Sequence, residues 1–167
     1  MNTAAPSMIE RPVDRWFNAY AQDHQHPLNQ RLHVLCVPAI VWSLMAMLYA
    51  APTPEAFAAE LPSYGVFAIV LAVASILFWL RLSWSLGLGI AVLTLAGLWV
   101  NAIILDAMGP MALLMIGIVV FVIAWIGQFI GHHIEGRRPS FFTDLVYLMI
   151  GPPWVLAKAY RALGLRW

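Results

Sequence analysis

All five histidines of the chain fall in two short segments that lie far apart in the sequence. The first segment holds His24, His26 and His33, and the second holds His132 and His133. Imidazole binds iron, zinc, copper and nickel, so histidines gathered in this way indicate a metal site. The chain has one cysteine and therefore neither a thiolate cage nor an intramolecular disulfide.

Helical spacing separates the two histidines of the second segment. His132 lies four residues after Gln128 and three before Glu135, so the three side chains share one face of a helix. His133 points about 100° away from that face. We therefore expect His132, with its amide and carboxylate neighbours, to contribute to the site and His133 to lie outside it.

The first segment contains a predicted helix start. Pro27 suits the first position of a helix, because the N–H group that proline lacks would have no partner there. His24 then precedes the helix. Asn29 and His33 are four residues apart, so they lie on one face within it.

The composition indicates a membrane protein. Hydrophobic residues make up 62% of the chain and charged residues 10%, and the mean hydropathy is +0.81, which is outside the usual range of soluble domains. Apolar stretches of spanning length predict four transmembrane helices, at residues 32–50, 64–80, 86–105 and 111–130. Gly109-Pro110 is the predicted turn between the last two. The predicted fold is a single all-α domain, a polytopic membrane helix bundle.

Both ends of the chain are predicted to lie at the membrane surface. Residues 1–31 form a polar arm in which Trp16, Phe17 and Tyr20 have the spacing of a short interfacial helix. Residues 139–167 are expected to form an interfacial or re-entrant tail, because Gly151-Pro152-Pro153 is expected to stop its short apolar run. The alternative is a fifth span that continues through the two prolines.

Charge placement gives the orientation of the four spans. All nine Lys and Arg residues precede the first span, separate the second from the third, or follow the fourth, whereas the opposite loops carry only acidic residues. Loops rich in Lys and Arg stay in the cytoplasm, so both termini and both histidine segments are predicted on the cytoplasmic side. The net charge of +1, without basic runs interleaved with aromatics, argues against nucleic-acid binding.

The residues alone leave several kinds of metal protein open. A haem between His33 and His132 is one, and a non-enzymatic binding or transport protein with a structural metal or a pH-sensing role is another. Di-iron membrane desaturases and hydroxylases are excluded, since they need more histidines than this chain has.

Two longer motifs surround the histidines. They are Tyr20-x3-His24-x2-Pro27-x-Asn29-x-Arg31-Leu32-His33 and Trp125-x2-Gln128-Phe129-Ile130-Gly131-His132-x2-Glu135-Gly136-x2-Pro139-Ser140-Phe141-Phe142. Both resemble motifs of the membrane 2-hydroxy fatty acid dioxygenases, a family named for metabolism of phytosphingosine to odd-numbered fatty acids. The resemblance runs from about Trp16 to Tyr160, and Cys36 departs from it where family members usually have glycine.

The resemblance implies an Fe(II)-dependent enzyme that uses O2 to cleave a long-chain 2-hydroxy fatty acid between C1 and C2. CO2 and an acid shortened by one carbon are released. The implied iron ligands are His24, His33 and His132. Six-coordinate iron with three protein ligands has room for the carboxylate and 2-hydroxyl of the substrate and for O2. Such a substrate partitions into membrane lipid with its carboxylate at headgroup depth, where the two motifs are predicted to meet.

The resemblance also implies roles for residues around the iron. Glu135 is expected as a fourth ligand or as the partner that fixes an imidazole tautomer. Asn29 and Gln128 are expected to support the ligands, and Arg137 or Arg31 to offset the charge of the substrate carboxylate.

Overall fold

The computed structural model describes residues 11–22, 24–136 and 141–167. The regular elements in these ranges are helices, and an isolated bridge joins Pro52 to Tyr64. The elements in chain order are α1 (Pro12–Gln22), α2 (Pro27–Ala50), the 3-10 helix η1 (Glu55–Phe57), α3 (Val66–Leu82), α4 (Trp84–Glu135) and α5 (Phe141–Ala162). The predicted all-α class is confirmed.

Helix α2 begins at Pro27, as its sequence predicts. The residue before it, His26, caps the helix, because its Nδ1 accepts a hydrogen bond of 3.2 Å from the backbone N–H of Leu28. His24 therefore precedes the helix. Asn29 and His33 are both buried on one face of its first turns.

Helix α4 is two helices joined at a bend. Gly109 has φ 82° and ψ 170°, a backbone conformation that residues other than glycine rarely adopt. Pro110 then suits the first turn of the next helix, so the predicted turn is confirmed. At the far end Gly136, with φ 74°, donates its N–H to the carbonyls of His132 and His133 and ends the helix.

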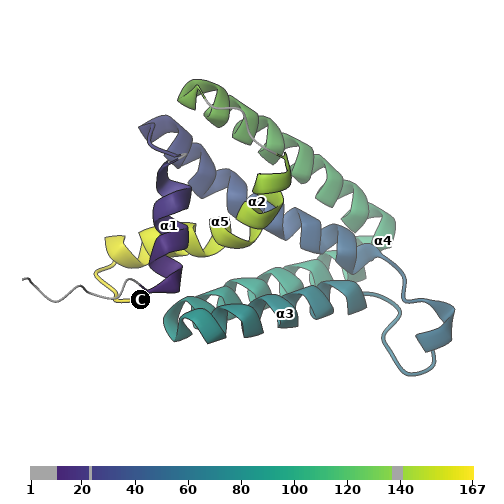
Figure 1. The fold of residues 1–167 in the computed structure, drawn as a ribbon. Coiled ribbons are helices and arrows are strands. Elements are labelled where there is room, and N and C mark those ends of the chain that lie inside the picture. The colour runs from purple at the N-terminus through teal and green to yellow at the C-terminus, as the bar shows by residue number, and fades with distance from the viewer. Residues whose placement is uncertain (1–10, 23, 137–140) are drawn as a thin grey trace, which may run out of the picture.

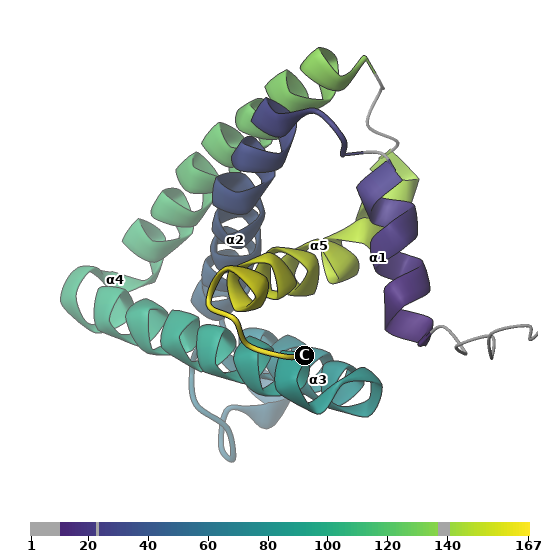
Figure 2. The same ribbon diagram turned by 90° about the vertical axis from the view of Figure 1, so that its left-hand side faces the viewer.

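The helices are arranged as two pairs with α5 between them. Helix α2 runs beside the second half of α4, and α3 runs beside the first half (Figures 1 and 2). Figure 1 shows the connector before α3 and the bend of α4 on the right, and the start of α2 and the end of α4 together at the upper left. The two histidine segments therefore meet at one end of the molecule.

Within the part of the chain that the structure describes, two helices are long and apolar enough to cross a membrane, by length and composition: Pro27–Ala50 and Trp84–Glu135. Helix α3 is also apolar but has 17 residues. Large apolar side chains are exposed along the outer faces of α3 and α4, among them Val70, Leu77, Val92 and Leu95. These features favour a membrane protein, and the four-span arrangement stays a prediction.

The expected stop at Gly151-Pro152-Pro153 is wrong, because α5 continues through both prolines to Ala162. Each proline removes one helical N–H, and α5 changes direction along its length (Figure 1). Burial compensates for the lost bonds, since Ile150, Trp154 and Ala157 on both sides of the prolines belong to a hydrophobic core.

Helix α1 has the predicted helical spacing, and its apolar face packs on the protein. Val13, Phe17 and Tyr20 are buried in the same core as residues of α3 and α5. The ring of Trp16 stacks on Phe78 of α3, with centroids 5.9 Å apart. Protein contacts thus cover side chains that the sequence suggested would face lipid headgroups.

Candidate metal centre

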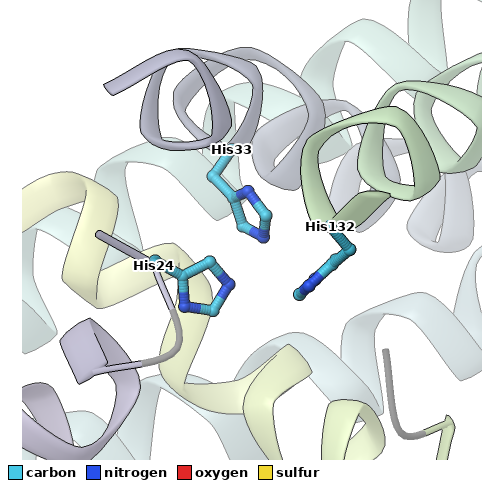
Figure 3. Close-up of side chains that lie close together, drawn as sticks. All are labelled: His24, His33 and His132. Carbon is cyan, nitrogen blue, oxygen red and sulfur yellow. The ribbon is translucent and has the colours of Figure 1, made fainter. Parts of the chain in front are cut away.

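Three histidines from different elements converge on one point (Figure 3). His24 lies in the connector between α1 and α2, His33 in α2, and His132 in the last turns of α4. Their side chains are buried, with exposed fractions of 2%, 2% and 7%. Each offers a ring nitrogen within 4.8 Å of the others. Bonds from zinc to histidine are about 2.0–2.1 Å long, so two nitrogens on one ion lie at most about 4.2 Å apart. Small movements of these side chains would therefore let the three imidazoles bind one ion.

Backbone carbonyls fix the tautomers of two of these imidazoles. His24 Nδ1 lies 2.6 Å from the carbonyl oxygen of Tyr20, and His33 Nδ1 lies 3.0 Å from that of Asn29. A carbonyl oxygen only accepts, so both Nδ1 atoms donate. The lone pair of each neutral ring is then on Nε2, the tautomer that a metal ligand with an oriented Nδ1–H requires. A set of imidazole nitrogens suits iron, zinc, copper or nickel.

Small residues let α4 approach α2 closely enough to bring His132 to His33. A Cβ added at Gly131 would overlap Asn29 Oδ1, and one added at Gly127 would lie 2.6 Å from Cys36 Sγ. The four-residue spacing of these glycines is a pattern that lets two helices approach closely. Cys36, the departure from the family pattern, fills the space left by Gly127.

Glu135 joins the two histidine segments by hydrogen bonds. Its Oε1 accepts from the backbone N–H of Gln25 and its Oε2 from that of His26, each at 2.9 Å. Oε2 also accepts from Asn29 Nδ2 at 2.9 Å. The carboxylate thus fixes the connector that carries His24 to the end of α4. It lies outside the group of three possible metal ligands found among the described residues.

The side-chain amides of Gln128 and Asn29 are buried beside the histidines, and each has one polar atom without a hydrogen-bond partner. Gln128 is 5% exposed and its Nε2 has no hydrogen-bond partner, while Asn29 is fully buried with Oδ1 unpartnered. Gln128 lies one turn before His132 on the same face of α4. An unsatisfied buried donor costs about 1–3 kcal/mol, so a ligand with an oxygen acceptor suits this position.

The remaining predicted residues are not brought to the histidines. Arg31 is exposed, and its position two residues from both Asn29 and His33 turns it to the other side of α2. His133 is exposed, as the spacing predicted. Arg137 lies outside the described residues.

Aromatic residues from α1 and α5 line one side of the centre. The ring of Tyr20 stacks on that of His24, with centroids 4.1 Å apart, and the ring of Trp154 lies 5.9 Å from that of His24. Tyr20 is part of the first motif, but the prolines had suggested that α5 was a surface tail. Sequence reasoning therefore missed Trp154.

Comparison with known proteins gives one match. The family described as 2-hydroxy-palmitic acid dioxygenase Mpo1-like matches residues 11–163. This range includes the three converging histidines and every described helix. No curated protein and no solved structure matches. Because the match covers nearly the whole chain, the protein belongs to the Mpo1-like family of 2-hydroxy-palmitic acid dioxygenases.

Proposed function

We propose that the protein is an Fe(II)-dependent dioxygenase that cleaves long-chain 2-hydroxy fatty acids between C1 and C2. The observation that carries the proposal is the group of three buried imidazoles, two of which are oriented through Nδ1 by backbone carbonyls. Family membership supports the substrate class. His24, His33 and His132 would hold the iron.

Bound Fe(II) would supply the redox chemistry by which O2 oxidises the substrate. The reaction balances without a further reductant: one 2-hydroxy acid and one O2 give one CO2, one water and one acid shortened by one carbon. The substrate supplies all four electrons that O2 takes up. We therefore expect one O2 consumed for each CO2 released.

The surrounding residues would orient the ligands and the substrate. Glu135 would keep His24 in place through its bonds to the connector. Gln128 Nε2, buried and unpartnered, would donate to a substrate oxygen. Asn29 would hold both Glu135, through Nδ2, and the His33 ring, through its carbonyl. Arg31 and Arg137 were expected to offset the charge of the substrate carboxylate. Arg31 is exposed, and Arg137 lies outside the described residues.

The geometry speaks against a haem between His33 and His132. Their ring centroids are 5.2 Å apart, and the ring of His24 lies 4.2 Å from that of His33 and 5.2 Å from that of His132. The third imidazole therefore occupies space that a macrocycle would need. A single ion suits three imidazoles better.

We further propose that the four predicted spans hold this centre near the cytoplasmic surface of the membrane. The apolar helices α2 and α4 support this setting. A long acyl chain could then stay in the lipid while its carboxylate and 2-hydroxyl reach the histidines. O2 is the second substrate, and membrane lipid is the surrounding partner.

Purified protein in lipid nanodiscs tests the proposal. Metal content and O2 consumption with 2-hydroxypalmitate are measured for the wild type, for His132→Ala and for the matched control His133→Ala. We expect the wild type to hold iron and to consume O2, His132→Ala to lose both, and His133→Ala to keep both, because His133 is exposed.

Two results would contradict the proposal in different ways. Iron and turnover retained by His132→Ala would show that the ligand set is wrong. A wild-type protein that holds metal but consumes no O2 with 2-hydroxypalmitate would instead indicate the non-enzymatic metal-binding alternative. A Soret band in the wild type would indicate haem.

A further inference from the structure

Lys158 on α5 is set apart from the other basic residues by its burial. Among the Lys and Arg residues that the structure describes, Lys158 is half-buried, and the rest are exposed: Arg11, Arg15, Arg31, Arg81, Arg161 and Arg166. Lys and Arg are rarely taken from water without a compensating partner. The position of Lys158 therefore calls for an explanation.

The contacts of Lys158 lead to His24 along two paths. Its Nζ donates to Gln30 Oε1 at 2.7 Å, and Gln30 Nε2 donates to the carbonyl oxygen of His24 at 2.7 Å. Its Nζ also lies 3.9 Å from the centroid of the Trp154 ring, which in turn is 5.9 Å from the His24 ring. On each path a single residue, Gln30 or Trp154, thus lies between Lys158 and the candidate metal ligand His24.

The partners of Lys158 among the described residues, Gln30 and Trp154, are neutral. An ammonium has three N–H donors, of which the amide of Gln30 takes one, and Trp154 contributes the face of its ring. The ion pair found among the described residues, Arg11 with Asp14, lies elsewhere. Burial, and secondly the nearby charge of Arg161, lower the pKa of Lys158. An anion beside Nζ would offset both effects.

We propose that Lys158 binds the carboxylate of the 2-hydroxy fatty acid and so selects acids over uncharged lipids. The inference rests on the proposed function and adds a specificity-determining residue to it. Gln30 and Trp154 hold the ammonium in place. Among the described residues, Gln30 Oε1 is the one acceptor of its three N–H donors. A charge-assisted bond to a carboxylate is then available near His24.

Anaerobic binding measurements in nanodiscs test this role without turnover. Equilibrium binding of tritiated 2-hydroxypalmitate is compared with that of tritiated hexadecane-1,2-diol, which has the same chain length and 2-hydroxyl but no carboxylate. We expect Lys158→Met to weaken binding of the acid about tenfold or more, since bonds to charged groups contribute about 1.5–3 kcal/mol. Binding of the diol should not change.

Two further variants separate charge from packing. Lys158→Arg keeps the charge and should retain most of the affinity for the acid. Arg81→Met removes an exposed charge in the last turn of α3 and should leave binding of both ligands unchanged. In aerobic assays Lys158→Met should raise KM for the acid with little change in kcat, because the interaction is made equally in the ground state.

The inference fails if Lys158→Met weakens the acid and the diol equally, since the lysine would then only hold α5 in place. It also fails if binding of the acid is unchanged. Absence of O2 consumption by a wild-type protein that binds the acid anaerobically, and loses that binding in Lys158→Met, would refute the proposed function alone.

Discussion

At the residue scale, Glu135 has hydrogen-bond partners that its expected roles, as a fourth metal ligand or as the partner of an imidazole, did not include. Its two oxygens receive three N–H donors, two from the backbone of the connector and one from Asn29. Spacing placed Glu135 on the face of His132. Spacing could not have revealed that the connector would present two backbone N–H groups to it, because that contact depends on how α1 and α2 are joined.

We predict that Glu135→Gln loosens the centre without changing the set of metal ligands. A glutamine amide accepts through one oxygen only, so at least one of the three donors loses its partner, at a cost of about 1–3 kcal/mol. Loss of such a supporting partner typically lowers metal affinity by about 10–100-fold. Iron should therefore dissociate faster from the variant, as measured by chelator competition.

The absorption spectrum of Co(II) substituted at the site provides the control for this interpretation. It should be the same in Glu135→Gln and in the wild type, because the three imidazoles remain. A changed spectrum would show that the carboxylate is itself a ligand. Glu55→Gln, a substitution of an exposed residue in the connector before α3, should alter neither spectrum nor dissociation.

At the scale of elements, the sequence predicted helix boundaries better than helix environments. Pro27 and Gly109 act locally, through a missing N–H and a positive φ, so the start of α2 and the bend of α4 could be read directly. The continuation of α5 through Pro152 and Pro153 depends on burial of residues such as Trp154 against α1 and α3. Tertiary packing of this kind leaves no local signal.

We predict that Gly131→Ala disturbs the contact between α2 and α4 and with it the metal centre. The added Cβ would overlap Asn29 Oδ1, so the helices must separate or the Asn29 amide must leave Glu135. Overpacking of this kind costs about 1–3 kcal/mol. Thermal unfolding followed by circular dichroism should show a lower midpoint, and iron content should fall.

The matched control is Gly97→Ala in the same helix. There the added Cβ would lie 3.4 Å from Trp42 Cδ1, an ordinary contact. Replacing a helical glycine by alanine favours the helix by about 0.5–1 kcal/mol, so this variant should be as stable as the wild type or more stable. Equal stability of Gly131→Ala and Gly97→Ala would contradict the proposed role of Gly131.

At the scale of the whole molecule, the charge map and the fold agree on which ends of the helices belong together. The placement of Lys and Arg residues puts the start of the first span and the end of the fourth on the same side of the membrane. The structure brings these two ends together at the histidines. The connector before α3 and the bend of α4 lie together on the opposite side in Figure 1. Sequence thus predicted the pairing of the two motifs, whereas the contribution of α5 required the fold.

The membrane orientation predicted from charge can be tested with single cysteines. Cys36, the one native cysteine, is first replaced by alanine, and Glu55→Cys, Asp106→Cys and Arg81→Cys are then introduced separately at exposed positions. In sealed vesicles whose cytoplasmic face is inside, a membrane-impermeant maleimide should label the first two positions. Arg81→Cys should react only after the vesicles are opened, because loops with Lys and Arg stay in the cytoplasm. Labelling of Asp106→Cys and Arg81→Cys from the same face would rule out four spans, since the apolar segment at residues 86–105 would not cross the membrane between them.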